Sequence, residues 1–141
     1  MKRTEVLFIS TLLCTPLVQA SDAPPSPAPA NATAYIISPS DGEVVGTTVT
    51  VKFGLQGMGV APAGVDRPNT GHHHLLINGE KLPPLDAPMG AEVMHFGGGQ
   101  TEKTITLSPG QHTLQLILGN HLHIPHTPPV ISEKITITVV E

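Results

Sequence analysis

The stretch TTVTVKFGL, residues 47–55, alternates apolar and polar side chains along most of its length. Because successive side chains of a β-strand point to opposite faces, this period of two predicts a half-buried strand rather than a helix. One face of that strand would carry Val49, Val51, Phe53 and Leu55, and the opposite face would carry Thr48, Thr50 and Lys52. The stretch therefore favours a β fold for the chain.

The rest of the chain repeats this kind of segment. Short runs rich in β-branched residues are separated by Gly, Pro, Asn and Asp, and no stretch shows a long helical period. Seven strands are expected, at residues 35–38, 47–55, 72–78, 92–96, 102–107, 112–118 and 133–140. Their spacing predicts an all-β fold, an immunoglobulin-like or fibronectin-III-like antiparallel β-sandwich of about seven strands. A small β-barrel or a jelly roll is the alternative.

The composition excludes several classes of partner. The chain has 141 residues with 7 Lys+Arg, 11 Asp+Glu and 8 His, for a formal net charge of −4. It therefore lacks the basic patch that binding to nucleic-acid phosphates needs. With no Trp, one Tyr and three Phe, it also offers few platforms on which bases or sugars could stack. Histidine is the unusual feature, because it outnumbers Lys and Arg together.

The N-terminus has the pattern of a secretory signal peptide. Two basic residues precede an apolar run too short to span a bilayer, and a small residue, Ala20, closes the segment. We therefore expect residues 1–20 to be removed on export to the periplasm, which leaves no transmembrane segment in the mature chain. Acylation of Cys14 as a lipoprotein is disfavoured, because the preceding Leu13 is larger than the small residue usual there.

The mature chain is expected to begin with a linker. Residues 21–34 are rich in Pro, Ala and Ser, which predicts an extended segment ahead of a folded domain at residues 35–141. Removal of Cys14 with the signal peptide leaves no cysteine. Disulfides, thiolate nucleophiles and cysteine ligands for zinc are therefore excluded, and stability has to come from the core or from a bound ligand.

Seven of the eight histidines map to one pole of the expected sandwich. In this topology, the loops that precede the third strand and follow the sixth strand gather at the same end. That end would hold His72, His73, His74, His95, His121, His123 and His126. His112 belongs to the opposite end, directly after a turn, where a structural role is expected because its ring can bond a nearby carbonyl.

The spacing of these histidines predicts a metal site. His72 and His74 lie two apart on a strand, so their rings share a face, and His121 and His123 repeat the spacing. Imidazoles from two such pairs form a normal set of ligands for Zn²⁺ or Cu²⁺. His73 points the other way and is expected to pack or hydrogen-bond. The candidate metal ligands are His72, His74, His121, His123, His126 and His95.

Two methionines favour copper over zinc as the bound ion. Met58 and Met94 are possible thioether ligands, and soft donors of this kind favour Cu⁺. Packing is nevertheless the commoner role of a methionine. The leading hypothesis is a periplasmic protein that buffers, carries or delivers copper or zinc.

Other interpretations stay open beside the metal site. A histidine-rich tract can scavenge metals without a defined site, and a buried histidine can simply satisfy backbone carbonyls. The main alternative function is a non-catalytic module of the cell envelope that presents its loops to an envelope protein, with structural histidines and no metal. An enzyme is not expected, because no Ser-His-Asp or paired-carboxylate arrangement can be identified. The catalytic alternative is a metal-dependent redox activity at the predicted metal site.

Five separate runs of the sequence point to a family, at residues 54–64, 69–77, 95–102, 109–116 and 123–130. Among them are GLQGMGVAPAG, NTGHHHLLI and HIPHTPPV. Together they resemble the bacterial exported family DUF4399, whose domain has no assigned function. The resemblance covers nearly all of residues 35–141. It implies a small exported bacterial domain, and it implies no activity.

Overall fold

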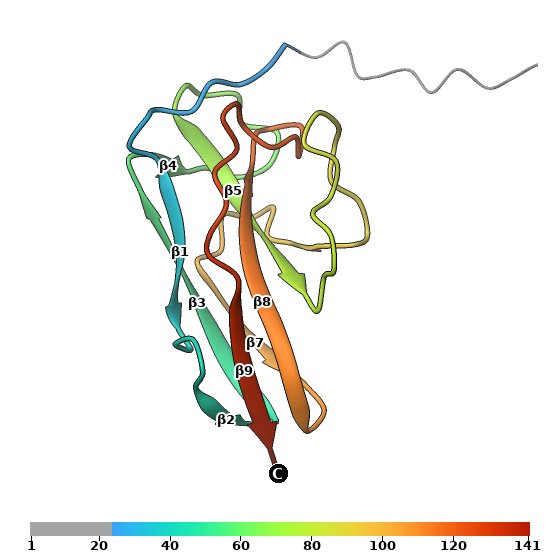
Figure 1. Cartoon of the computed structure of the whole chain (residues 1–141). Helices are drawn as coiled ribbons and strands as arrows, with labels where there is room; N and C mark the ends of the chain where they lie inside the picture. Colours follow the sequence, from blue (N-terminus) through green and yellow to red (C-terminus); the bar gives the residue numbers. More distant parts are fainter. Residues whose placement is uncertain (1–23) are drawn as a thin grey trace, which may run out of the picture.

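The computed structural model describes residues 24–141 (Figure 1). The predicted signal peptide, residues 1–20 with Cys14, lies outside the described residues, and so does the start of the predicted linker. Within the described part, no helix is long and apolar enough to cross a membrane. The strands there are β1 (Thr33–Ser38), β2 (Val44–Gly46), β3 (Thr48–Gln56), β4 (Gly59–Val60), β5 (Thr70–Ile77), β6 (Met94–His95), β7 (Glu102–Thr106), β8 (Gly110–Gly119) and β9 (Ile135–Val140).

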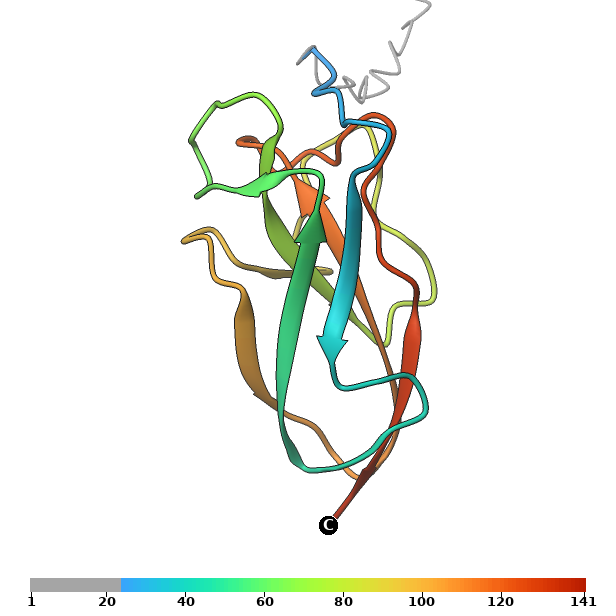
Figure 2. The same cartoon turned by 90° about the vertical axis from the view of Figure 1, so that its left-hand side faces the viewer.

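The strands form two sheets in a sandwich-like arrangement. The smaller sheet has the order β1-β3-β7, with antiparallel pairs (Figure 2). The larger sheet has the order β2-β9-β8-β5-β4, and β6 pairs with β5. Its pairs are antiparallel except at the two ends, where β2 runs parallel to β9 and β4 runs parallel to β5. The prediction of an all-β fold is confirmed, whereas the immunoglobulin-like or fibronectin-III-like subtype stays a prediction.

The stretch that predicted the fold is β3, and its apolar face lies in the core as expected. Val49, Val51 and Phe53 are buried, and Leu55 is partly buried against them. The larger sheet contributes Leu75, Leu114, Leu116, Leu118, Ile135, Ile137 and Val139 to the same core. Full burial of such a side chain contributes about 1.5–3 kcal/mol each. β5, which carries three of the histidines, is part of this core through Leu75.

The folded domain begins earlier than the predicted residue 35. β1 starts at Thr33, and Ala34 within it is only 2% exposed. Further upstream, the Ala28 amide donates to the Thr127 carbonyl at 3.1 Å. The end of the segment predicted as a linker therefore packs on the folded domain. The composition did not reveal these contacts, because pairing with β3 and with the loop after β8 uses backbone groups that leave no apolar pattern.

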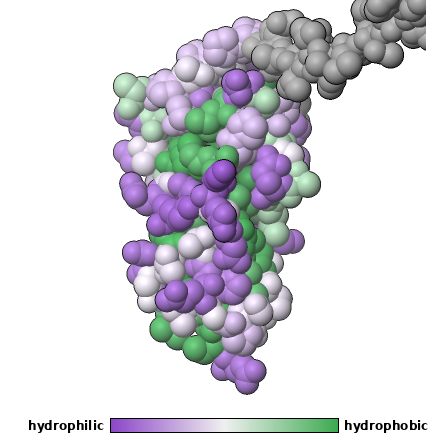
Figure 3. All heavy atoms as spheres, turned by 45° about the vertical axis from the view of Figure 1, so that its right-hand side comes forward, coloured by the Kyte–Doolittle hydropathy of each residue, from purple (hydrophilic) through white to green (hydrophobic). Residues whose placement is uncertain are grey.

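A second, smaller core lies on the other face of the larger sheet. The long segment between β5 and β6 runs beside this sheet (Figure 1) and brings Met89 and Val93 against Leu76 of β5 and Ile117 of β8. Figure 3 turns the side of the molecule that carries this segment toward the viewer, and hydrophobic residues lie there among hydrophilic ones. The segment therefore shields the outer face of β5 from water, next to the place where His72 and His74 project.

Candidate metal centre

The three consecutive histidines of β5 divide between the two faces of the larger sheet. His73 faces the core between the sheets, where its ring centroid lies 5.3 Å from that of Phe53. His72 and His74 face the other way, with ring centroids 4.7 Å apart. Each of the three is at most 1% exposed. The prediction that His72 and His74 share a face and that His73 does not is confirmed.

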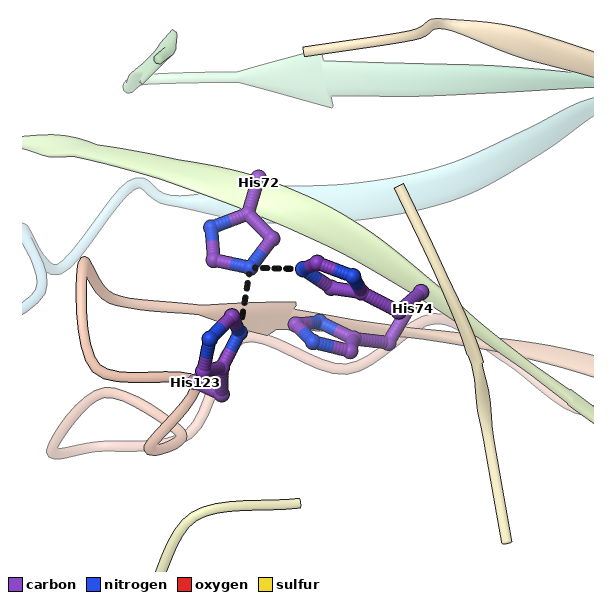
Figure 4. Close-up of side chains that lie close together, drawn as sticks. His72, His74 and His123 are labelled. Atoms are coloured by element: carbon purple, nitrogen blue, oxygen red, sulfur yellow. Dashed lines mark hydrogen bonds between the residues drawn. The ribbon is translucent and has the colours of Figure 1, made fainter. Parts of the chain in front are cut away.

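Two further histidines join His72 and His74 from distant parts of the sequence. His95 lies in β6, directly opposite His74 in the antiparallel pair with β5. His123 lies in the loop after β8, and Figure 4 shows it pointing toward His72 and His74. One ring nitrogen of each of these four histidines lies within 4.8 Å of the others. We call His72, His74, His95 and His123 the histidine cluster.

Two pairs of ring nitrogens in the cluster lie about as close together as the ligands of one ion do. His72 Nε2 lies 3.1 Å from His123 Nδ1 and 3.2 Å from His95 Nε2. Two nitrogens bound to a tetrahedral ion at 2.0–2.1 Å are about 3.3–3.4 Å apart. A ring nitrogen carries either one proton or one lone pair, so His72 Nε2 cannot make two full hydrogen bonds at once. A cation at the centre of the cluster could instead be bound by a lone pair from each of the four imidazoles.

Burial lowers the pKa of three members of the cluster, His72, His74 and His123. The pKa of His72 is lowered to about 3, first by burial and then by the neighbouring imidazoles of His74, His123 and His95. The pKa of His74 is lowered to about 4, again by burial first and then by His95 and His123. Burial and the neighbouring His95 also lower the pKa of His123. Because a metal binds only the deprotonated imidazole, these lone pairs are available well below neutral pH.

Several ring nitrogens have no hydrogen-bond partner among the described residues. In the cluster, these are both nitrogens of His74 and Nδ1 of His72, and all three are buried. Leaving a buried polar atom without a partner costs about 1–3 kcal/mol, so folded proteins rarely do it. A bound ion would supply the missing partner for His74. The donor set and its unpartnered atoms therefore fit a transition-metal ion.

Asn120 holds the loop that carries His123. His123 has a φ of 66°, which is uncommon for a residue other than glycine. Its amide donates to the Asn120 carbonyl at 2.9 Å. The Asn120 side-chain oxygen accepts from the Leu122 and Ile124 amides at 2.9 and 3.0 Å, and its side-chain nitrogen donates to Ser26 Oγ at 2.9 Å. Asn120 is thus a positioning residue for the loop that carries His123.

Two glycines make room for the rings. Gly119 pairs with His72 across β5 and β8, and a Cβ there would lie 2.6 Å from His74 Cε1. A Cβ on Gly97 would collide with the ring of His95. Neither Gly97 nor Gly119 has a positive φ, so backbone conformation does not require a glycine at either position. Glycine is required because the imidazole rings come so close to these two residues.

Two predicted ligands lie outside the cluster. His121 Nδ1 is 3.5 Å from Asp66 Oδ1 at a partly exposed position. His126 is buried, and its Nε2 donates to the Thr70 carbonyl at 3.1 Å. Both histidines line a separate cavity of about 350 Å³. The spacing argument does not extend to His121 and His123, because residues in a loop do not alternate as residues in a strand do.

The structure does not place Met58 and Met94, the two possible thioether ligands, facing the cluster. Met94 lies opposite Leu75 in the pair of β5 with β6, so its side chain projects from the face opposite to His95. Met58 packs against the core between the sheets. Met89, which the sequence analysis did not single out, lies instead beside the cluster: its Cε and the ring of His74 both adjoin Gly119.

His112 has the structural role that its position after a turn predicts. Its Nε2 donates to the Ser108 carbonyl, and its Nδ1 accepts from Asn78 Nδ2, both at 2.8 Å. These bonds fasten the turn after β7 to the turn after β5. The prediction for His112 is therefore confirmed, and its two ring nitrogens are both used.

Comparison with known proteins places the chain in a family. The model of the DUF4399 family, a domain of unknown function, matches residues 51–140. The chain belongs to the DUF4399 family. The DUF4399 match runs from within β3 to the end of β9 and includes every member of the histidine cluster. Searches of curated proteins and of solved structures found no match.

Proposed function

We propose that this DUF4399 protein is exported to the periplasm and binds one transition-metal ion, copper ahead of zinc, through His72, His74, His95 and His123. It would buffer, carry or deliver the ion. The observation that supports this most strongly is the convergence of four imidazoles from three separate segments within 4.8 Å of one another. Export rests on the signal-peptide pattern of residues 1–20.

Two chemical arguments favour copper. Nitrogen donors bind Cu²⁺ more tightly than Zn²⁺ at comparable sites. The expected mature chain has no cysteine, so zinc loses the thiolate ligands that its structural sites commonly use. The proposal is for a binding protein and not for an enzyme, because the members of the cluster are histidines alone and include no nucleophile or carboxylate.

A titration of the processed protein tests the proposal. The metal-free protein would be titrated with Cu²⁺, Cu⁺ and Zn²⁺, beside the double variant His72→Ala/His74→Ala. We expect one ion per chain for the unaltered protein and no stoichiometric binding for the double variant. The matched control is His121→Ala, which removes an imidazole outside the cluster and should leave binding unchanged.

The fold of each variant would be checked by circular dichroism, so that lost binding is not confused with unfolding. Equal binding by the unaltered protein and by a folded double variant would contradict the assignment of the site. Loss of binding in His121→Ala alone would place the ion elsewhere, beside Asp66.

The second candidate function is a non-catalytic interaction module of the cell envelope. Exposed apolar side chains on β1, β2 and β9 favour it, with Ile37 55%, Val44 62% and Val140 44% exposed. On this hypothesis the histidines are structural and no metal is needed. Purification without bound metal, together with a melting temperature that a chelator leaves unchanged, would favour this function over the first.

A further inference from the structure

Met89 lies against the histidine cluster. Its amide donates to the His123 carbonyl at 2.9 Å, so the segment before β6 is fastened to the loop after β8. A Cβ on Gly119 would lie 3.0 Å from Met89 Cε and 3.1 Å from His74 Nδ1. The Met89 methyl carbon and a nitrogen of the cluster therefore both crowd the position that a Gly119 side chain would take, which sets the end of the Met89 side chain beside His74.

The surroundings of Met89 are apolar and largely buried. Met89 is 8% exposed and belongs to the second core with Leu76, Val93 and Ile117. Two strand residues of this core lie close to the cluster, since Leu76 follows His74 on the same face of β5 and Ile117 pairs with His74. An ion held here has imidazoles on one side and hydrocarbon with a thioether on the other.

The charge of the cluster favours a monovalent ion. Its members are imidazoles alone, of which His72 and His74 are buried, and no carboxylate is among them. The cost of burying an ion rises with the square of its charge, so a divalent ion costs about four times as much as a monovalent one. The acid nearest in sequence to β6, Glu92, is engaged with the Gly90 amide at 3.0 Å.

We propose that the site selects the cuprous ion and that the Met89 thioether is an additional ligand that sets this selectivity. The inference rests on the proposed function, because it needs an ion at the histidine cluster. Cu⁺ has a single charge and accepts imidazole and thioether donors, whereas Zn²⁺ gains little from a thioether. The Met89 sulfur therefore stabilises bound Cu⁺ far more than bound Zn²⁺.

The test compares Met89→Leu with Met94→Leu in the processed protein. Leucine keeps most of the volume of methionine and removes only the sulfur as a donor, and Met94 projects away from the cluster. Cu⁺ affinity would be measured without oxygen by competition with bicinchoninate, and Zn²⁺ affinity by competition with a chromophoric chelator. X-ray absorption of the Cu⁺ form would report whether a sulfur is bound.

We expect a sulfur ligand in the unaltered protein and in Met94→Leu, and its loss in Met89→Leu. In Met89→Leu, Cu⁺ affinity should fall about tenfold while Zn²⁺ affinity changes less than about threefold. Unchanged Cu⁺ affinity or no bound sulfur would overturn the inference and leave the proposed function standing, provided that the histidines still bind an ion. No binding of any ion would overturn both.

Discussion

The two faces of β5 carry chemically identical side chains and use them differently. On the inner face, His73 is fully buried against Phe53, and neither of its nitrogens has a partner among the described residues. On the outer face, His72 and His74 are equally buried but meet His95 and His123. Burial lowers the pKa of the imidazole on both faces. Burial and an altered pKa therefore do not make a site; convergence of donors does.

The sharpest test of this comparison replaces one histidine on each face with leucine. His74→Leu removes a ligand from the cluster and should weaken metal binding by at least about 100-fold. His73→Leu should leave metal affinity within about threefold, because its ring lies on the core side of the sheet. Calorimetric titration of both variants measures the difference. Equal losses of metal affinity in the two variants would mean that the two faces of β5 do not act independently in metal binding.

Low pH should destabilise the metal-free protein through the histidines on both faces of β5. The pKa values of His72, His73 and His74 are about 3, 4 and 4 in the folded protein, while an exposed histidine titrates near 6.5. Between these values the unfolded chain binds more protons, so stability is full above about pH 6.5 and falls toward pH 4. Urea unfolding at pH 7.0, 5.5 and 4.5 checks this, and His73→Leu should reduce the slope. A flat profile would argue that these imidazoles are protonated when folded.

A substitution at Gly119 tests the outer face of β5 alone. In Gly119→Ala the new methyl group would displace the ring of His74, which lies 2.6 Å from its position, and we expect metal affinity to fall about tenfold. Gly46→Ala is the matched control, because a Cβ on Gly46 meets nothing within 4 Å. Metal titration of the two variants measures the effect. Similar affinities would mean that the cluster tolerates a shift of His74.

The smallest expected effect concerns the inner face. His73→Leu removes two buried nitrogens that lack partners among the described residues, and we expect it to stabilise the metal-free protein by about 1 kcal/mol. Chemical denaturation at pH 7 measures the change. A loss of stability would show that the His73 ring makes a polar interaction in solution that matters to the fold.

The sequence predicted what depends on strand periodicity. The alternation of residues 47–55 identified the inner face of β3, and the same rule assigned His72 and His74 to one face and His73 to the other. It could not predict the pairing of His95 with His74, because β6 is only two residues long and carries no periodic pattern. It also grouped His121 and His126 with the cluster, although their nearest partners are Asp66 and Thr70.

By itself, the sequence determined the all-β class and which histidines lie on each face of β5. It also determined that the predicted mature chain offers imidazoles as metal ligands and no cysteine. Only the tertiary structure decided which histidines meet. His123 is positioned by bonds from its loop through Asn120 to Ser26, and Met89 by its bond to the His123 carbonyl. Such contacts join residues far apart in the chain, and loops have no fixed side-chain period. The physical information that places these groups therefore arises only when the segments pack together.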